Sequence, residues 1–137
     1  MKLVIDYEWI EVGEILQDSS GKLLFPDLDA RPAVYCFQFL GGPTESNYIG
    51  ETDNLRRRAA HYRNPGPSQR THIRLNKRML AHFASRGRVT LKLITQARIE
   101  VDGCAFPLDI TEPVNRKILE NTALLQAKRG GSALENA

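Results

Sequence analysis

Lysine and arginine are gathered in the middle of this sequence in a way that suits a phosphate-bearing partner. Twelve of the 19 Lys and Arg residues lie between Asn54 and Ile99, and these 46 residues contain no Asp or Glu. Because each phosphate neutralised by Lys or Arg releases condensed counterions, such a span favours binding of a polyanion. A basic face that only keeps the protein soluble is the plainer alternative. Charge does not say whether a bound phosphate is cut.

Glu120 is the acidic residue with the best setting for metal-assisted chemistry. It is the only acid between Val114 and Leu134, in a segment with helical spacing. Its carboxylate is a suitable hard-oxygen ligand for one Mg²⁺ or Mn²⁺, with waters and phosphate oxygens in the other positions. Together with the basic span it could serve phosphodiester hydrolysis, which needs a positioned water, a base and positive charge on the phosphoryl oxygens. A simple surface acid is the alternative.

Six elements are expected to position these residues. Strands are indicated by β-forming runs at residues 33–40, at about 47–50 and at 89–94, the first two joined as a hairpin. Helical spacing and capping signals indicate helices from Thr52 or Asp53 to Pro65, from about Thr71 to Gly87, and from Pro113 to Gly130. The sequence therefore predicts a small α/β sandwich, in which about three helices flank a three-stranded sheet made of the antiparallel hairpin and one further strand.

One domain is expected from the length of 137 residues. Residues 1–31 are acidic and mixed in pattern, and we expect them to form an N-terminal extension packed on a core domain of residues 32–137. No apolar run approaches the roughly 20 residues of a membrane span, and Asp6 and Glu8 come too early for a signal peptide. Cys36 and Cys104 fit reduced thiols better than a disulfide. A cytoplasmic protein is expected, and its oligomeric state stays open.

The hairpin and the first helix resemble the GIY-YIG nuclease family. Ala33-Val34-Tyr35 stands where the family has Gly-Ile-Tyr, and Tyr48-Ile49-Gly50 keeps the second element intact. Arg58 follows ten residues after the second tyrosine, as in the family, and Leu119-Glu120-Asn121 is similar to its metal-binding helix. The resemblance covers residues 33 to 130 in the right order. Ala33 in place of the first glycine removes only backbone freedom in a strand.

The resemblance implies a metal-dependent endonuclease that cuts nucleic acid, expected to be DNA, with RNA left open. Glu120 would hold one Mg²⁺ or Mn²⁺, and Tyr35 and Tyr48 would activate or orient water. Arg58 would stabilise the phosphate with a fork of hydrogen bonds that lysine does not reproduce. The family also implies roles for His61, one turn after Arg58, and for an asparagine beyond the glutamate helix, here Asn136. The alternative is a nucleic-acid-binding module that keeps the same basic face and cuts nothing.

Seven further basic residues are assigned to nucleic-acid binding: Arg56, Arg57, Arg63, Arg70, Arg74, Lys77 and Arg78. His72 and His82 are interpreted as surface or helix-capping groups. A strand tyrosine is more often a core residue, and this alternative stays open for Tyr35.

The hairpin register decides whether the two tyrosines can share a site. Side chains alternate along a strand, so tyrosines that serve one site must lie on the same face. Pairing Leu40 with Asn47 around a six-residue turn places Tyr35 and Tyr48 on one face, whereas a five-residue turn would place them on opposite faces. We predict the six-residue turn.

Overall fold

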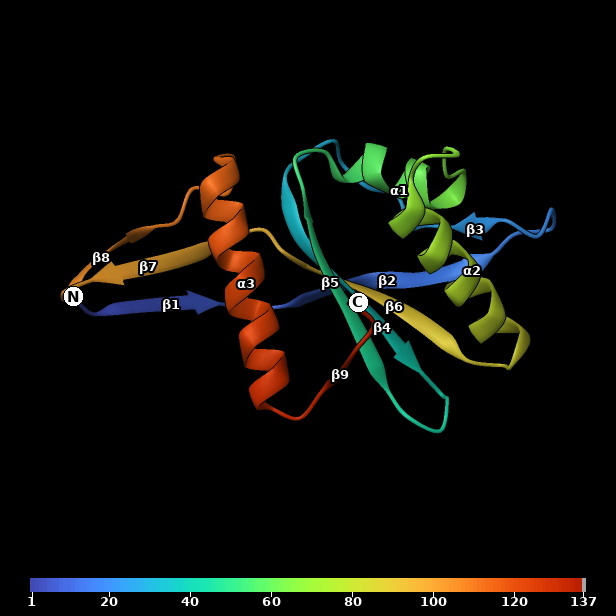
Figure 1. Cartoon of the computed structure of the whole chain (residues 1–137). Helices are drawn as coiled ribbons and strands as arrows, with labels where there is room; N and C mark the ends of the chain where they lie inside the picture. The colour runs from blue at the N-terminus through green and yellow to red at the C-terminus, as the bar shows by residue number, and fades with distance from the viewer. Residues whose placement is uncertain (137) are drawn as a thin grey trace.

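The computed structural model describes residues 1–136, and two sheets and three helices make up its framework (Figure 1). The central sheet has the strand order β3-β2-β6-β4-β5-β9 and a smaller sheet has the order β1-β7-β8. The central strands are β2 (Ile10–Gln17), β3 (Leu23–Leu24), β4 (Ala33–Leu40), β5 (Ser46–Thr52), β6 (Arg88–Ile94) and β9 (Ala133–Leu134). The others are β1 (Leu3–Tyr7), β7 (Ala97–Val101) and β8 (Cys104–Pro107), with helices α1 (Leu55–Arg63), α2 (Arg70–Ala84) and α3 (Pro113–Arg129).

Both faces of the central sheet are covered, and β4 lies at its middle. Tyr35, Phe37 and Phe39 of β4 join one core cluster with buried residues of α1 and α2. Val34 and Cys36, which alternate with them, join a second cluster with buried residues of α3. A strand buried on both faces has a continuous apolar sequence, as residues 33–40 have. In Figure 1, α3 crosses in front of the region between the two sheets, while α1 and α2 lie toward the right, over the end of the central sheet that is farther from the small sheet.

The prediction of a three-stranded sheet was wrong in its extent. The three predicted strands are present as β4, β5 and β6, but β2, β3 and β9 widen the sheet to six strands within residues 1–136. Residues 1–31 thus supply strands, with Ile15 and Leu23 buried in the core. The alternation of side chains between the two faces of β2 is interrupted between Glu11 and Gly13, where the register of β2 against β6 shifts. This interruption hides the strand pattern in the sequence.

The hairpin confirms the shared face of the tyrosines but not the predicted partners. Phe39 pairs with Ser46 and Phe37 with Tyr48, so the turn has six residues, 40–45, and begins one residue earlier than predicted. The carbonyl of Leu40 instead accepts a hydrogen bond from His82 Nε2 at 2.6 Å. A one-residue displacement of the turn shifts the pairing by two positions, which preserves the face.

The helices begin and end close to their predicted bounds. Asn54, rather than Thr52 or Asp53, caps α1, and its side chain accepts a hydrogen bond from the Arg57 amide at 3.0 Å. Among the described residues, none of the helices has both the length and the apolar character that crossing a bilayer requires. Both cysteines are free, Cys36 being buried and Cys104 exposed.

Candidate active site

Three tyrosines and an arginine meet between the central sheet and α1. The hydroxyl groups of Tyr35, on β4, and Tyr62, on α1, lie 2.7 Å apart, and Arg58 Nη1 donates to the Tyr35 hydroxyl at 3.3 Å. The ring centroids of Tyr35 and Tyr48 are 6.3 Å apart. The structure therefore brings together Tyr35, Tyr48 and Arg58, and adds Tyr62 to them.

The two tyrosines found in the sequence differ in exposure. Tyr35 is 1% exposed, whereas Tyr48 is partly exposed and lines a surface hollow. The ring of Tyr48 is thus accessible from the surface, while the buried hydroxyl of Tyr35 contacts Arg58 and Tyr62.

Gly50 is required by the position of Tyr35. The two residues are cross-strand partners, and a Cβ atom on residue 50 would lie 2.6 Å from Tyr35 Oη and 2.7 Å from Cζ. Atoms at those separations overlap, so a side chain at residue 50 would displace the Tyr35 ring. The glycine of Tyr48-Ile49-Gly50 thus makes room for the first tyrosine.

Gly50→Ala should destabilise the protein by about 2 kcal/mol, because forcing a methyl group into a filled core costs ~1–3 kcal/mol. Urea unfolding of the wild type and the variant measures this difference. In a Tyr35→Leu background the same substitution should cost less than half as much, because the clashing ring atoms are gone. An equal cost in both backgrounds would refute the steric explanation.

Burial keeps the phenols of this cluster protonated. It raises the pKa of Tyr35 and of Tyr62 far above the ordinary value, and for both the charge of a neighbouring tyrosine adds to the effect. Burial also raises the pKa of Tyr48, which the charge of Arg58 partly offsets. None of the three is a phenolate at neutral pH in the free protein.

Stability should therefore fall steeply under alkaline conditions. The folded-state pKa values of Tyr35 and Tyr62 are raised, so their contribution is complete below the unfolded-state pKa of about 10 and is lost as the pH rises above it. Urea unfolding at a series of pH values from about 8 to about 11, a range that spans the unfolded-state pKa, tests this. Tyr62→Phe should show a shallower decline, and an identical decline would contradict the assignment.

The hollow beside the cluster is lined by Tyr48, Arg58, Gln69, Arg70, Thr71 and His72. Within residues 1–136, Nδ1 of His72 is a buried side-chain nitrogen without a hydrogen-bond partner. Burial lowers the pKa of His72, and the charges of Arg58 and His61 lower it further. A neutral imidazole therefore lines a hollow that also contains a guanidinium group and a phenol, and its Nδ1 lies buried without a partner.

Tyr62 was not predicted to be a site residue, and His72 was interpreted as a surface or helix-capping group, whereas the structure places it in the lining of the hollow. Tyr62 follows Arg58 by four residues and so shares its helix face, a signal that could have been used. His72 carries no such signal, because its place depends on how α2 packs against α1. The predicted His61 lies next to it, with ring centroids 5.7 Å apart.

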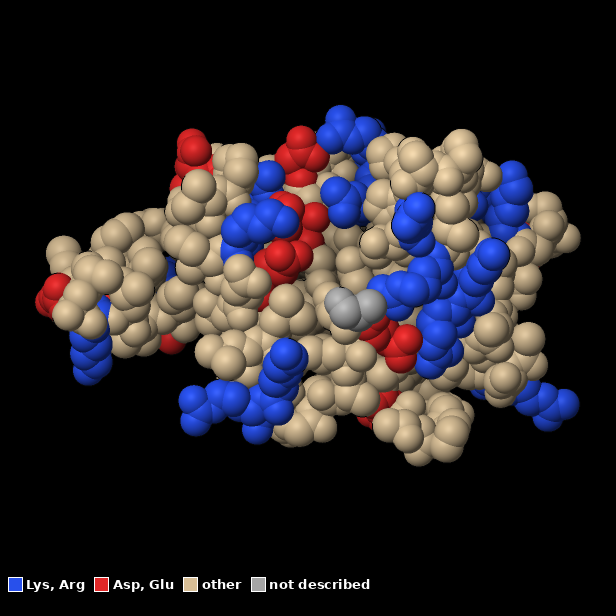
Figure 2. Space-filling model, viewed as in Figure 1, with Lys and Arg blue, Asp and Glu red and all other residues tan. Residues whose placement is uncertain are grey.

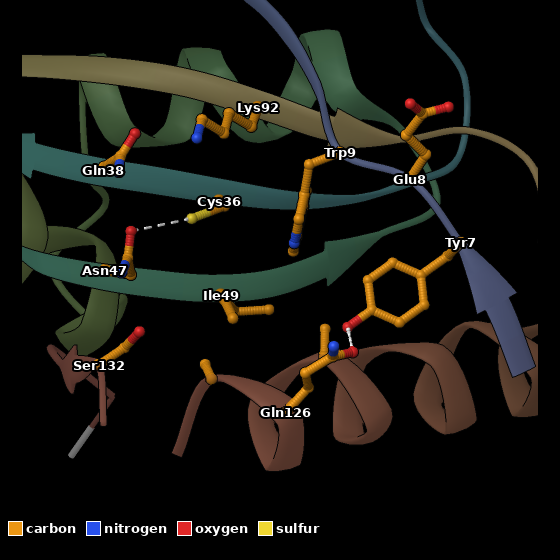
Figure 3. A pocket seen from close by; sticks show the side chains of 12 residues that line it. Tyr7, Glu8, Trp9, Cys36, Gln38, Asn47, Ile49, Lys92, Gln126 and Ser132 are labelled. Carbon is orange, nitrogen blue, oxygen red and sulfur yellow. Dashed lines mark hydrogen bonds between the residues drawn. The ribbon is translucent and has the colours of Figure 1, made fainter. Parts of the chain in front are cut away.

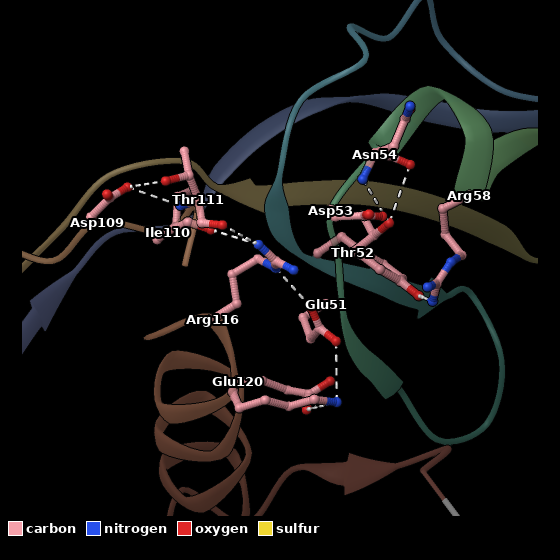
Figure 4. Close-up of polar contacts among 12 residues, drawn as sticks. Glu51, Thr52, Asp53, Asn54, Arg58, Asp109, Ile110, Thr111, Arg116 and Glu120 are labelled. Carbon is pink, nitrogen blue, oxygen red and sulfur yellow. Dashed lines mark hydrogen bonds and ion pairs between the residues drawn. The ribbon is translucent and has the colours of Figure 1, made fainter. Parts of the chain in front are cut away.

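Glu120 lies on α3 where that helix packs against β5. Figure 4 shows Arg58 and Glu120 on either side of β5 in that view. Lys117 Nζ lies 3.9 Å from Glu120 and 3.1 Å from Glu51, and Glu51 also pairs with the buried Arg116 at 2.8 Å. Burial raises the pKa of Glu120, and so does the charge of Glu51, although Lys117 opposes them.

The residues around Glu120 fit a single divalent cation. Its side chain is only 18% exposed, and burial, with the charge of Glu51, raises its pKa although Lys117 opposes them. No cluster of three or more His, Cys, Asp or Glu suited to a metal occurs in residues 1–136, so an all-protein cage is absent there. Mg²⁺ accepts one or two carboxylates with waters and phosphate oxygens in the remaining positions, which is the set available here.

Most of the predicted nucleic-acid-binding residues make contacts within the chain. Arg56 donates to the Leu28 carbonyl, Arg57 pairs with Asp53, and Arg63 contacts Asp18 and the Leu23 carbonyl. Arg74 and Arg78 both contact Glu135, whereas Arg70 and Lys77 have exposed side chains on α2. In Figure 2, Lys and Arg atoms gather over α1 and α2, and acidic atoms lie between them and α3.

Asn136 lies beside Tyr48 rather than in the hollow. Its side-chain nitrogen donates to the Ile49 carbonyl at 2.7 Å, and its side-chain oxygen accepts from the Ile49 amide at 3.0 Å. The predicted asparagine thus fixes the backbone next to the tyrosine.

A second hollow, of about 500 Å³, lies between α3 and the other face of the sheet (Figure 3). Tyr7, Trp9, Asn47 and Lys92 are among the residues that line it. None of the predicted catalytic residues does so. Of the predicted catalytic residues, Tyr48 and Arg58 line the other hollow, beside α1 and α2.

The chain matches no family model and no curated protein. Among solved structures it is similar to a glutamate-to-alanine mutant of EndoII from bacteriophage T4. The TM-score is 0.59 and the sequence identity is 17%, over 94% of this chain and 91% of the other. At this identity the likeness shows a shared fold.

Proposed function

We propose that this chain, which has a GIY-YIG-like fold, is a divalent-metal-dependent endonuclease that hydrolyses nucleic-acid phosphodiesters, with DNA as the expected substrate. The observation that carries the proposal is the convergence of Tyr48, Arg58 and His72, from three different elements, around one hollow. The charge of Glu120, from a fourth element, is close enough to raise the pKa of Tyr48.

The charge distribution supports a phosphate-bearing substrate. Arg70 lines the hollow and Lys77 lies further along the exposed side of α2, so both could contact a strand that passes Tyr48. Arg58 lies deeper and is held by the Tyr35 hydroxyl. Its remaining guanidinium hydrogens can donate to two oxygens of the scissile phosphate, where negative charge grows during attack.

The proton of the attacking water would pass to His72 rather than to a tyrosine. The raised pKa of Tyr48 makes its phenol a poor acceptor, whereas the lowered pKa of His72 keeps its imidazole neutral. Tyr48 would then orient the water by hydrogen bonding. The water oxygen bonds to phosphorus, the bond to the leaving oxygen breaks, and that oxygen takes up a proton from solvent water.

Glu120 would hold the cation, with Glu51 kept in place nearby by Arg116 and Lys117. When bound, the cation supplies positive charge to the phosphoryl oxygens and lowers the pKa of its bound water.

Incubation of the protein with supercoiled plasmid and Mg²⁺ or Mn²⁺ tests the proposal. We expect conversion to nicked or linear DNA, and none in the presence of EDTA. The alternative is a nucleic-acid-binding module that cuts nothing, which the basic span alone would support. Retention of DNA in a gel without any cleavage of DNA or RNA would establish that alternative and overturn the nuclease.

A further inference from the structure

Glu135 makes four hydrogen bonds that join two separate elements. Its amide donates to the Asn47 carbonyl at 2.7 Å, and its carboxylate accepts from the Ser46 hydroxyl at 2.7 Å, both on β5. The other carboxylate oxygen accepts from Arg78 Nε at 3.1 Å, and its carbonyl accepts from Arg74 at 2.9 Å, both on α2. No sequence pattern predicts a role for this residue.

The partners of Glu135 are themselves well fixed. Ser46 is 4% exposed, and the Arg78 guanidinium stacks over the Phe39 ring at 4.6 Å from its centroid. Burial would raise the pKa of Glu135, but the Ser46 hydroxyl and Arg78 outweigh it and lower the pKa. The carboxylate is therefore charged at neutral pH, and both of its oxygens have partners.

The two elements joined by Glu135 carry two walls of the hollow. On β5, Ser46 and Asn47 immediately precede Tyr48. On α2, Arg74 follows His72 by two residues. Strand β9 pairs in parallel with β5 at Ser46 and Asn47, and the side chain of Asn136 bonds the Ile49 backbone beyond it. The backbone on both sides of Tyr48 is thus held from the same segment.

We infer that Glu135 is a positioning residue, which locks β5 to α2 and thereby holds Tyr48 opposite His72 and Arg58. The inference rests on the proposed nuclease function, and it adds the device that sets the geometry of that site. A displacement of about 1 Å in a reacting group can cost up to ~100-fold in rate, so a lock of this kind affects turnover more than binding.

Glu135→Ala and Ser46→Ala test the lock, and Glu14→Ala serves as the control. Glu14 pairs with Arg88 at 3.4 Å on the other side of the sheet, so the control also removes a carboxylate from an arginine. Hydrogen exchange of the Ile49 amide, which donates to Asn136, reports the lock without any cleavage assay. We expect its protection to fall about tenfold or more in both test variants and to stay unchanged in the control.

Steady-state cleavage provides the second measurement. We expect kcat to fall about tenfold or more in Glu135→Ala, with KM unchanged or lower because Arg78, which loses its carboxylate partner, becomes free to meet phosphate. Ser46→Ala removes one hydrogen bond and keeps the ion pair with Arg78, so its kcat should lie between those of Glu135→Ala and the wild type.

The outcomes separate the lock from the proposed function. Unchanged Ile49 protection in Glu135→Ala overturns the lock, whatever the activity. If the Ile49 amide of Glu135→Ala loses protection but kcat and KM equal those of Glu14→Ala, the positioning role is overturned. If the wild type cuts no nucleic acid, the nuclease proposal fails, while the exchange result still decides whether Glu135 holds β5.

Discussion

Glu120→Gln should reduce cleavage about a thousandfold or more while leaving the fold intact. An amide keeps the shape of the side chain but removes the charge that would bind the cation. Loss of metal-ion catalysis costs several kcal/mol of transition-state stabilisation, and each ~1.4 kcal/mol corresponds to tenfold in rate. Plasmid cleavage under single-turnover conditions measures the loss, and isothermal titration with Mn²⁺ measures the binding of the cation.

The matched control is Glu112→Gln, an exposed glutamate at the start of the same helix. It should cut at the wild-type rate. If Glu120→Gln retained wild-type cleavage and Mn²⁺ binding, Glu120 would not hold the metal.

The pH dependence of wild-type cleavage provides an independent test of Glu120. Because the pKa of Glu120 is raised, activity should be lost on acidification at a higher pH than an ordinary glutamate would give.

Arg58→Lys should lower kcat about 100- to 1000-fold, which is the usual loss when one donor to a developing oxyanion is removed. Lysine keeps the positive charge but lacks the planar fork, so it could not contact the Tyr35 hydroxyl and a phosphate together, as the proposal requires of Arg58. The loss should appear in kcat and in kcat/KM together, because the interaction forms fully only in the transition state.

Arg98→Lys makes the same change at an exposed position on β7 and should leave cleavage unchanged. Thermal unfolding of the two variants and the wild type shows whether the fold is retained. Wild-type kcat in a folded Arg58→Lys protein would mean that charge alone is needed at this position, and the proposed fork would be wrong.

The features that sequence analysis predicted correctly depend on local patterns. Strand β4 is an uninterrupted run of β-forming residues, and the helix after Tyr48 begins with a capping residue. The shared face of Tyr35 and Tyr48 followed from turn length alone, since side chains alternate along a strand.

The features that sequence analysis missed depend on contacts between distant segments. Strand β7 pairs with β1, nearly the whole chain away, and β8 is short and exposed. His72 gains its chemical setting only when α2 packs against α1. The roles predicted for Arg74 and Arg78 followed from their charge, which could not reveal that Glu135 lies beside them.

The outermost strands of the central sheet, β3 and β9, have a consequence for how the molecule behaves in concentrated solution. Each contains only two residues, and each lies against a much longer neighbour. An uncovered long strand offers a row of free amide and carbonyl groups on which another chain can add a strand and begin to aggregate. Residues 133–136 bond backbone amide and carbonyl groups along part of β5. The same contacts that hold the backbone around Tyr48 therefore also shield this edge of the sheet from self-association.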